Sequence, residues 1–349
     1  MATVTILGAG AMGSALATPA VAAGNQVRLW GTWLDDGILA ELRAGRPHPR
    51  TGVRVDPRVG LHDAGGLDAA LDGADLVAVA ISSDGVLEVA RRAAAAGLGA
   101  GTPLLLCTKG FGRHPDGGVG LLPGLVVAAA GGSRPVVAVG GPCKANAVAA
   151  GRPTAAVFAG EDRAAVERCA RAVATPAYRV QRGRDPVGVE AAAATKNVYA
   201  IAVGLCHGLG EAGGQPWHDL AAATFTQAVA EMGRLAVALG GRQETVLGLA
   251  GLGDLEVTSL SGRNRVLGAR VGRGEPPAEA LAAMAAAGQT VEGVPAARLA
   301  RDLAAQLARE RPDEAGDLPA RLPLLAAVNR LLDGDPHPAA LVATAVLPS

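Results

Sequence analysis

Residues 3–17, TVTILGAGAMGSALA, decide the fold of the N-terminal half of the chain. The first five residues predict a buried strand, and the alanine-rich end predicts a helix. Three glycines between them have Gly-x-Gly-x-x-Gly spacing: the first permits a tight turn, the second lets the backbone approach a pyrophosphate, and the third allows close helix packing. The phosphate would lie at the positive end of the helix dipole. The residues predicted to bind a dinucleotide here are Gly8, Gly10, Ala11, Met12 and Gly13.

A second strand, NQVRLW (25–30), follows at the distance expected for a dinucleotide-binding unit. Sites that prefer NAD usually carry Asp or Glu at the end of this strand. Here the strand ends in Trp-Gly-Thr, and Asp35 and Asp36 come a few residues later, where they could equally be solvated. Arg28 could alternatively contact a 2′-phosphate. The sequence therefore predicts Thr32 as a cofactor-binding residue and leaves NAD and NADP both open.

Three further segments continue the alternation of apolar strands and alanine-rich helices: residues 74–90, 101–111 and 134–160. This alternation predicts a doubly wound, mostly parallel sheet. Ligands of such sheets bind outside the carboxyl ends of the strands. We therefore expect Lys109 and the loop 140–146, which follow two of these strands, to lie at the ligand-binding edge.

The pattern changes near residue 186. Residues 187–210 and 218–240 have helical periodicity, and no convincing strand follows them. We predict an α/β Rossmann domain over residues 1–185 and an all-α domain over residues 186–349, which would carry the substrate and the catalytic residues.

The overall composition narrows the class of protein. Half of the residues are apolar and the formal net charge is zero, so we expect a globular protein that does not bind nucleic acid. The chain has no run of about eighteen apolar residues, so we expect no membrane span. Its four cysteines form no Cys-x-x-Cys pair, and this favours a reduced, cytoplasmic protein.

Lysine is rare enough to be informative. Only three of the 32 basic residues are lysines, namely Lys109, Lys144 and Lys196. Lys196 lies in the apolar helical stretch ATKNVYAIAVG, where desolvation would lower its pKa toward a range useful for proton transfer. The alternative is a lysine that extends along an amphipathic helix to solvent. The adjacent Asn197 and the absence of other nearby charges in the sequence favour the catalytic interpretation.

The segment GLGDLEVTSLSGRNRVLG (251–268) combines an acid, several hydroxyls and an Arg-Asn-Arg run between two helical stretches. Arg263 and Asn264 suit an anion, because a guanidinium can form bidentate hydrogen bonds with phosphate. Asp254 could orient Lys196 or a substrate hydroxyl. A solvated helix connector would explain the arginines but not the whole combination.

Six motifs together resemble the NAD(P)-dependent glycerol-3-phosphate dehydrogenase family and cover nearly the whole chain. In order, they are GAGAMGSALA (8–17), CTKGF (107–111), GGPCKANAV (140–148), TKNVYAIAVGLCHGLG (195–210), GLAGLGDLEVTSLSGRNRVLG (248–268) and VEGV (291–294). The resemblance implies a Rossmann domain followed by a helical domain. It also implies reversible reduction of dihydroxyacetone phosphate to sn-glycerol 3-phosphate with NAD or NADP, without a metal, by a homodimer.

The resemblance also assigns roles to residues of this sequence. The implied catalytic residues are Lys196 as the acid/base, Lys109 and Asp254. The implied substrate-binding residues are Lys109, Gly141, Cys143, Asn197, Arg263 and Asn264. The implied cofactor-binding residues beyond the glycine-rich turn and Thr32 are Lys109, Ala145, Arg263, Thr290 and Glu292.

The loop after residue 140 departs from the family pattern Gly-Pro-Ser/Thr-Phe-Ala-x-Glu. Cys143 replaces a hydroxyl, Lys144 an aromatic residue and Ala147 a glutamate. These changes leave open a specialised relative that reduces another phosphorylated or phosphonate-bearing ketone or aldehyde. A non-catalytic sensor of nicotinamide redox state is a further alternative, but it would need only the glycine-rich turn. A 6-phosphogluconate-type dehydrogenase shares the architecture but fits the GLGDL segment poorly.

Overall fold

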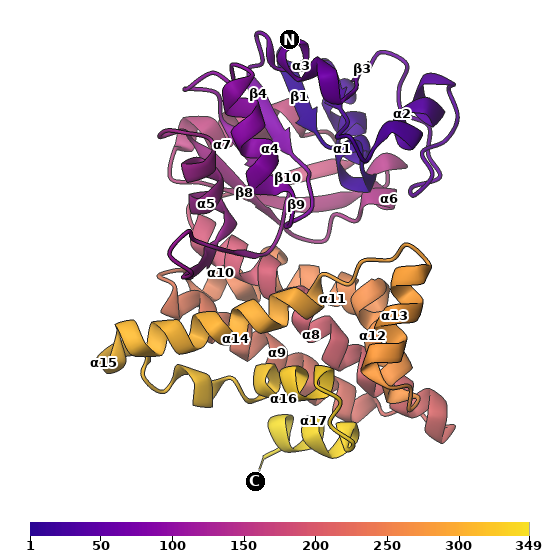
Figure 1. Ribbon diagram of the computed structural model, residues 1–349, viewed down its shortest axis with the longest axis vertical. Coiled ribbons are helices and arrows are strands. Elements are labelled where there is room, and N and C mark those ends of the chain that lie inside the picture. Colours follow the sequence, from indigo (N-terminus) through magenta and orange to yellow (C-terminus); the bar gives the residue numbers. More distant parts are fainter. Residues whose placement is uncertain (349) are drawn as a thin grey trace. The chain divides into compact units, whose positions relative to one another are not determined.

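The computed structural model describes residues 1–348. Two compact units form, and the chain passes between them more than once (Figure 1). The first contains residues 1–109 and 121–190, and the second contains residues 110–120 and the chain from residue 191 onward. A short segment from the middle of the α/β region therefore belongs to the helical unit, which the sequence did not predict.

The first unit is built on an eight-stranded sheet with the order β10-β9-β8-β5-β4-β1-β2-β3. The strands from β3 across to β8 are parallel to their neighbours, and only β8 and β9 pair antiparallel. This confirms the predicted doubly wound, mostly parallel sheet. The strands are β1 (Thr3–Leu7), β2 (Gln26–Trp30), β3 (Gly60–His62), β4 (Leu76–Val79), β5 (Leu104–Leu106), β8 (Val136–Gly140), β9 (Thr154–Ala159) and β10 (Tyr178–Gly183).

Both faces of this sheet are buried, as expected for parallel strands. Along β4, Leu76 and Ala78 pack into one hydrophobic cluster, whereas Val77 and Val79 pack into the other. The first cluster includes side chains of α1, α2, α6 and α7, and the second includes side chains of α3, α4 and α5. These helices are α1 (Ala11–Ala22), α2 (Asp36–Arg43), α3 (Leu67–Leu71), α4 (Val86–Ala95), α5 (Leu122–Ala129), α6 (Ala145–Ala149) and α7 (Arg163–Val173).

The second unit is helical, as predicted, apart from a two-stranded sheet formed by β6 (Phe111–Arg113) and β7 (Val119–Leu121). Its long helix α8 (Pro186–Gly213) begins in the first unit. The remaining helices are α9 (His218–Ala238), α10 (Gln243–Leu247), α11 (Asp254–Leu260), α12 (Arg263–Gly272), α13 (Pro277–Ala286), α14 (Gly293–Glu310), α15 (Pro312–Ala315), α16 (Pro323–Leu332) and α17 (Pro338–Val346).

The backbones of α8 and α12 touch where they cross. A Cβ on Gly204 of α8 would lie 2.3 Å from the carbonyl oxygen of Arg265, and one on Gly268 of α12 would lie 1.9 Å from that of Ile201. Real Cβ atoms do not approach backbone this closely, so both positions require glycine. This crossing fixes Lys196 and Asn197 on α8 relative to the start of α12.

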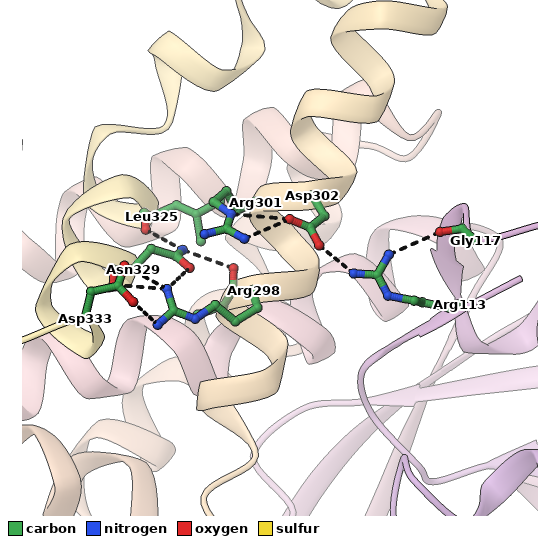
Figure 2. A network of polar contacts seen from close by, with 9 residues as sticks. Arg113, Gly117, Arg298, Arg301, Asp302, Leu325, Asn329 and Asp333 are labelled. Carbon is green, nitrogen blue, oxygen red and sulfur yellow. Dashed lines mark hydrogen bonds and ion pairs between the residues drawn. The ribbon is translucent and has the colours of Figure 1, made fainter. Parts of the chain in front are cut away.

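Segment 110–120 is fastened to α14 by polar contacts. Figure 2 shows the guanidinium of Arg113 between the carbonyl of Gly117 and the carboxylate of Asp302, at 3.1 and 2.6 Å. The backbone N–H of Val119 also donates to Gln306 Oε1 at 2.7 Å. These contacts explain why the segment belongs to the helical unit.

Among the helices of residues 1–348, none combines the length and apolar character needed to cross a bilayer.

Candidate active site

The glycine-rich turn has the geometry of a dinucleotide cradle. Gly8 adopts a φ of 107°, and its N–H donates to the carbonyl of Trp30 at 2.8 Å, which joins the ends of β1 and β2. A Cβ on Gly13 would lie 1.9 Å from the carbonyl oxygen of Gly8, whereas a Cβ on Gly10 would meet nothing within 4 Å. Gly13 is thus needed for packing, and Gly10 leaves open space where a pyrophosphate would approach the helix N-terminus. These residues fit a nicotinamide dinucleotide.

Arg28 is engaged elsewhere than at a cofactor phosphate. Its guanidinium donates to the carbonyl oxygens of Ala69 and Ala70, at 3.1 and 3.3 Å, and to that of Asp72. These contacts lie at the end of α3, where helical carbonyls lack partners within the helix. The interpretation of Arg28 as a 2′-phosphate ligand is not supported by this geometry, since a cap at α3 already uses the side chain.

An acidic residue, Asp35, follows β2 by five residues, and the sequence left open whether it is solvated. The side chain of Asp35 turns back toward the strand, and Oδ2 accepts hydrogen bonds from the backbone N–H and the hydroxyl of Thr32, at 2.8 and 2.9 Å. The N–H of Ala9, within the glycine-rich turn, lies 3.4 Å from the same oxygen. Thr32 itself is buried, so its hydroxyl mainly holds Asp35 in place.

Lys109 follows β5, at the edge where ligands of parallel sheets bind. The preceding residue, Thr108, is buried and donates its hydroxyl to the carbonyl of Ile81 at 2.7 Å, which joins the ends of β5 and β4. Thr108 therefore anchors the strand end from which Lys109 extends. Lys109 is half-buried and retains polar contacts of its own.

The loop after β8 places its thiol inward. Gly141 adopts a φ of 110°, and Cys143 Sγ lies 3.4 Å from the Gly141 carbonyl oxygen. Cys143 belongs to the hydrophobic core beneath the sheet and is 5% exposed. Ala145, at the first position of α6, is only partly buried. The substitution of a family hydroxyl by Cys143 therefore changes packing behind the loop, where Gly141 is also buried, and Ala145 is partly exposed.

In the second unit, Lys196 is paired with Asp254. Lys196 Nζ bonds Asp254 Oδ1, and the two residues are 8% and 2% exposed. The sequence left open whether Asp254 orients Lys196 or a substrate hydroxyl, and the structure places its carboxylate against the lysine from a position 58 residues away. An adjacent carboxylate stabilises the ammonium form, which is the form that can donate a proton.

The helix that carries Asp254 is preceded by an unusual turn. Residues Leu249–Gly253 form one stretch of π-helix, and α11 begins at Asp254. A Cβ on Gly251 would lie 2.2 Å from the carbonyl oxygen of Val246, so this turn is tightly packed. π-Helical turns are rare and are frequent at functional sites. Here the turn orients the carboxylate that meets Lys196.

Two buried amides connect α8, α12 and the start of α14. Asn264 Nδ2 donates to Asn197 Oδ1 at 2.9 Å, and Asn264 Oδ1 accepts from the N–H of Gly293 at 2.9 Å. Asn197 Nδ2 lies 3.4 Å from Glu292 Oε2. Asn197, Asn264 and Glu292 therefore form one polar chain, and much of the hydrogen-bonding capacity of both amides is used within the protein.

Arg263 and Thr290 are exposed. Arg263 is the first residue of α12, after Gly262 with a φ of 139°. The free N–H groups and the positive dipole end of a helix favour an anion, and Arg263 adds a full positive charge there. Thr290 lies in the connection before α14, two residues from Glu292.

The sequence interpretation missed a buried acid, Glu190 on α8. Both of its carboxyl oxygens are buried without a hydrogen-bond partner among the described residues. Burial raises the pKa of Glu190 to about 8, against the lowering effect of the Lys109 charge. A lone Glu in the apolar stretch VGVEAAAATKNVYAIAVG was the available signal.

No group of three or more His, Cys, Asp or Glu side chains within residues 1–348 is arranged to hold a metal ion. The structure instead provides a dinucleotide cradle on an α/β unit and a buried Lys–Asp pair on a helical unit. This combination defines a nicotinamide-dependent oxidoreductase.

The chain belongs to the NAD-dependent glycerol-3-phosphate dehydrogenase family. Residues 3–166 match the N-terminal part of this family, and residues 185–343 match its C-terminal part. The resemblance inferred from the motifs is thereby confirmed, as is its implication of an oxidoreductase that uses NAD or NADP.

Several proteins are similar over most of their length. A glycerol-3-phosphate dehydrogenase [NAD(P)+] of Thiobacillus denitrificans is 39% identical over 315 residues, covering 88% of this chain and 90% of the relative. The NADP(+)-dependent glycerol-3-phosphate dehydrogenase of Archaeoglobus fulgidus is 36% identical over 312 residues, covering 87% and 90%. The crystal structure of the Coxiella burnetii glycerol-3-phosphate dehydrogenase matches with a TM-score of 0.81 and 31% identity, covering 98% of each chain.

Proposed function

We propose that this chain catalyses the reversible reduction of dihydroxyacetone phosphate to sn-glycerol 3-phosphate with a nicotinamide cofactor. The observation that carries the proposal is the buried pair of Lys196 and Asp254 on the helical unit. Reduction of a ketone requires a proton donor for the carbonyl oxygen of the substrate. The Lys196 ammonium can supply this proton, and the Asp254 carboxylate stabilises it in the charged form. The substrate is proposed from the similar proteins, which are glycerol-3-phosphate dehydrogenases.

The bound nicotinamide would supply the hydride in reduction and accept it in oxidation. The Lys196 ammonium would donate a proton to the carbonyl oxygen, and neutral Lys196 would remove it in the reverse direction. Asp254 would orient Lys196 and stabilise its charged form. Lys109 would polarise the carbonyl and stabilise the negative charge that develops on its oxygen.

The phosphate of the substrate would bind at the start of α12. The Arg263 guanidinium and the N–H groups of the first helical turn are both donors suited to phosphate oxygens. The Asn264 amide would act mainly by fixing this turn, since it bonds Asn197 and Gly293. The exposed position of Arg263 suits a group that meets its ligand from solvent.

We further propose residues 1–185 as the dinucleotide-binding domain and 186–349 as the substrate domain. The family descriptions, which match residues 3–166 and 185–343, support a boundary close to this one. A homodimeric, cytoplasmic enzyme is the expectation from the family resemblance and from the scattered cysteines.

A second candidate substrate rests on the loop after β8. Cys143 lies in the core, and Lys144 and Ala147 replace an aromatic residue and an acid of the family pattern. A changed loop could admit another phosphorylated or phosphonate-bearing ketone or aldehyde. Retention of Lys196, Asp254 and Arg263 argues for the same reaction on any such substrate.

The test follows loss of reduced nicotinamide absorbance with dihydroxyacetone phosphate, and with unphosphorylated dihydroxyacetone as the matched control. We expect turnover of the phosphate ester and a kcat/KM for the control that is lower by about two orders of magnitude, since the charge-assisted contacts of the phosphate are lost. Cofactor binding without turnover of any phosphorylated ketone would contradict catalysis. Turnover of a different phosphorylated ketone alone would favour the second candidate.

A further inference from the structure

The carboxylate of Asp35 is held at the end of β2 rather than used as a helix cap. Asp35 directly precedes α2, yet its side chain makes no capping hydrogen bond to that helix. Oδ2 instead accepts the two hydrogen bonds from Thr32 and approaches the Ala9 N–H. All of these contacts involve Oδ2, so Oδ1 remains for a ligand within the described part of the chain.

The surrounding backbone is built to bring this carboxylate close to the glycine-rich turn. Gly31 has no Cβ, and one placed there would lie 3.1 Å from Asp35 Cβ and 2.7 Å from a methyl of Leu39. The carbonyl of Ala9, in the same turn, lies 3.0 Å from His48 Nε2. The turn after β2 therefore folds back and brings the Asp35 carboxylate to the position that an Asp or Glu at the end of β2 occupies in NAD-preferring sites.

Two of the basic side chains nearby are engaged in other contacts. Arg28 caps α3, as described above. Arg92 lies over the ring of Trp33 at 4.2 Å and pairs with Glu88 at 2.8 Å. Arg50 is exposed, and its charge acts on His48 in the sense opposite to that of Asp35, which makes it the cation to test beside Asp35.

We propose that Asp35 is the residue that binds the adenosine ribose hydroxyls and makes this enzyme prefer NADH to NADPH. A carboxylate accepts hydrogen bonds from the ribose 2′- and 3′-hydroxyls, and it repels a 2′-phosphate. The inference rests on the use of a nicotinamide cofactor by this family and is independent of the substrate. A preference for NADH would distinguish this chain from the NADP(+)-dependent relative of Archaeoglobus fulgidus.

The test measures dissociation constants of NADH and NADPH by calorimetry on the full chain, without substrate. The variants are Asp35→Asn, which keeps an oxygen for the Thr32 donors, and Asp36→Asn, which removes the neighbouring exposed charge as a matched control. We expect wild-type protein to bind NADH at least about tenfold more tightly, a difference of about 1.4 kcal/mol. Asp35→Asn should reduce that ratio by about tenfold, and Asp36→Asn should leave it unchanged.

Equal or tighter binding of NADPH by the wild type would overturn the proposal, as would an unchanged ratio in Asp35→Asn. An Arg50→Gln variant tests the alternative that Arg50 binds the 2′-phosphate. In that case the variant would bind NADPH more weakly, and its affinity for NADH would not change. Since no substrate is present, failure of the proposed ketone reduction would leave these binding constants unaffected. The two proposals can therefore fail separately.

Discussion

The proposed cofactor site in the first unit (the cofactor half) and the proposed substrate site in the second unit (the substrate half) use different parts of the polypeptide. The cofactor half, in the first unit, is made largely of backbone: Gly8 in a left-handed conformation, Gly10 beside open space and Gly13 against a carbonyl. The substrate half, in the second unit, is made of buried charged and amide side chains. Lys196 meets Asp254 across 58 residues, and Asn197 meets Asn264 across 67.

This difference predicts opposite sensitivities. The cofactor half should fail when an atom is added, because a Cβ would occupy space that the backbone or the ligand needs. The substrate half should fail when a charge is removed, because the remaining buried partner loses its opposite charge. Catalysis and cofactor binding should therefore be separable by mutation.

The largest effect is expected at Lys196. Lys196→Met should lower kcat by about 10² to 10⁴-fold, the range supplied by a positioned acid/base, and should leave the dissociation constant of NADH within about twofold of wild type. Because this change leaves Asp254 buried without its cation, the double variant Lys196→Met/Asp254→Asn serves as a folding control. Stopped-flow absorbance and calorimetry measure the two quantities. Substantial turnover by either variant would remove Lys196 from the mechanism.

The next effect is expected at Gly13. In Gly13→Ala the new methyl would lie 1.9 Å from the Gly8 carbonyl oxygen, a backbone atom that cannot rotate away. Overpacking of this kind costs about 1 to 3 kcal/mol of folding stability, so the melting temperature should fall. NADH should also bind at least about tenfold more weakly, because the Gly8 backbone that would cradle it is displaced.

Gly10→Ala is the matched control for Gly13→Ala, because a Cβ on Gly10 meets no protein atom within 4 Å. It should weaken NADH binding while leaving the melting temperature unchanged. Equal loss of stability in both variants would show that the turn is not shaped around a ligand.

The same difference decides what the sequence could predict. The glycine-rich turn was predictable because its requirements lie within six neighbouring residues. Lys196 and Asp254 could be assigned roles through resemblance to a family, but their ion pair could not be derived from periodicity, since tertiary packing joins them. The hydrogen bonds of Asn264 to Asn197 and Gly293 could likewise not be derived from the sequence.

The features that the sequence did not predict also have physical reasons. Asp35 lies five residues beyond β2, so a rule based on strand ends overlooks a carboxylate that folds back. The strands β3, β6 and β7 have three residues each, too few to show alternation. Cys143 was expected to replace a hydroxyl facing the substrate, but the loop turns its thiol into the core. Nothing in local sequence specifies which way a loop side chain points.

Glu190 and Glu231 provide a matched pair of buried acids. Glu231 is satisfied by Tyr199 and Gln227 and by the N–H groups of Leu324 and Leu325. Both oxygens of Glu190 lack such partners among the described residues, and burial raises its pKa to about 8 from an ordinary value of 4.5. The folded protein therefore keeps the Glu190 proton that the unfolded chain loses.

This difference in proton binding lowers stability as the pH rises from about 4.5 to about 8, by at most about 1.4 kcal/mol per pH unit. Glu190→Gln mimics the neutral acid, so its stability advantage over wild type should grow by about 1 kcal/mol between pH 6 and pH 7. Chemical denaturation at the two pH values measures this. Glu231→Gln should instead destabilise the folded protein, because the new amide N–H groups would face donors such as the N–H groups of Leu324 and Leu325. An advantage of Glu190→Gln that is constant with pH would mean Glu190 is ionised in the folded state.

The smallest effect is expected where segment 110–120 meets α14 (Figure 2). Arg113 and Asp302 form an ion pair at 2.6 Å, but their side chains are 51% and 29% exposed, so solvent screens the attraction. Arg113→Ala should therefore cost about 0.2 to 1 kcal/mol and lower the melting temperature by only a few degrees. Hydrogen exchange should nevertheless speed up in residues 111–119, because Arg113 also holds the Gly117 carbonyl.

Arg301→Ala is the control, since Arg301 pairs with Asp302 within α14 and does not contact the segment in the network drawn. Equal exchange in the two variants would show that packing of the segment on α14, and not the Arg113 ion pair, keeps it in place.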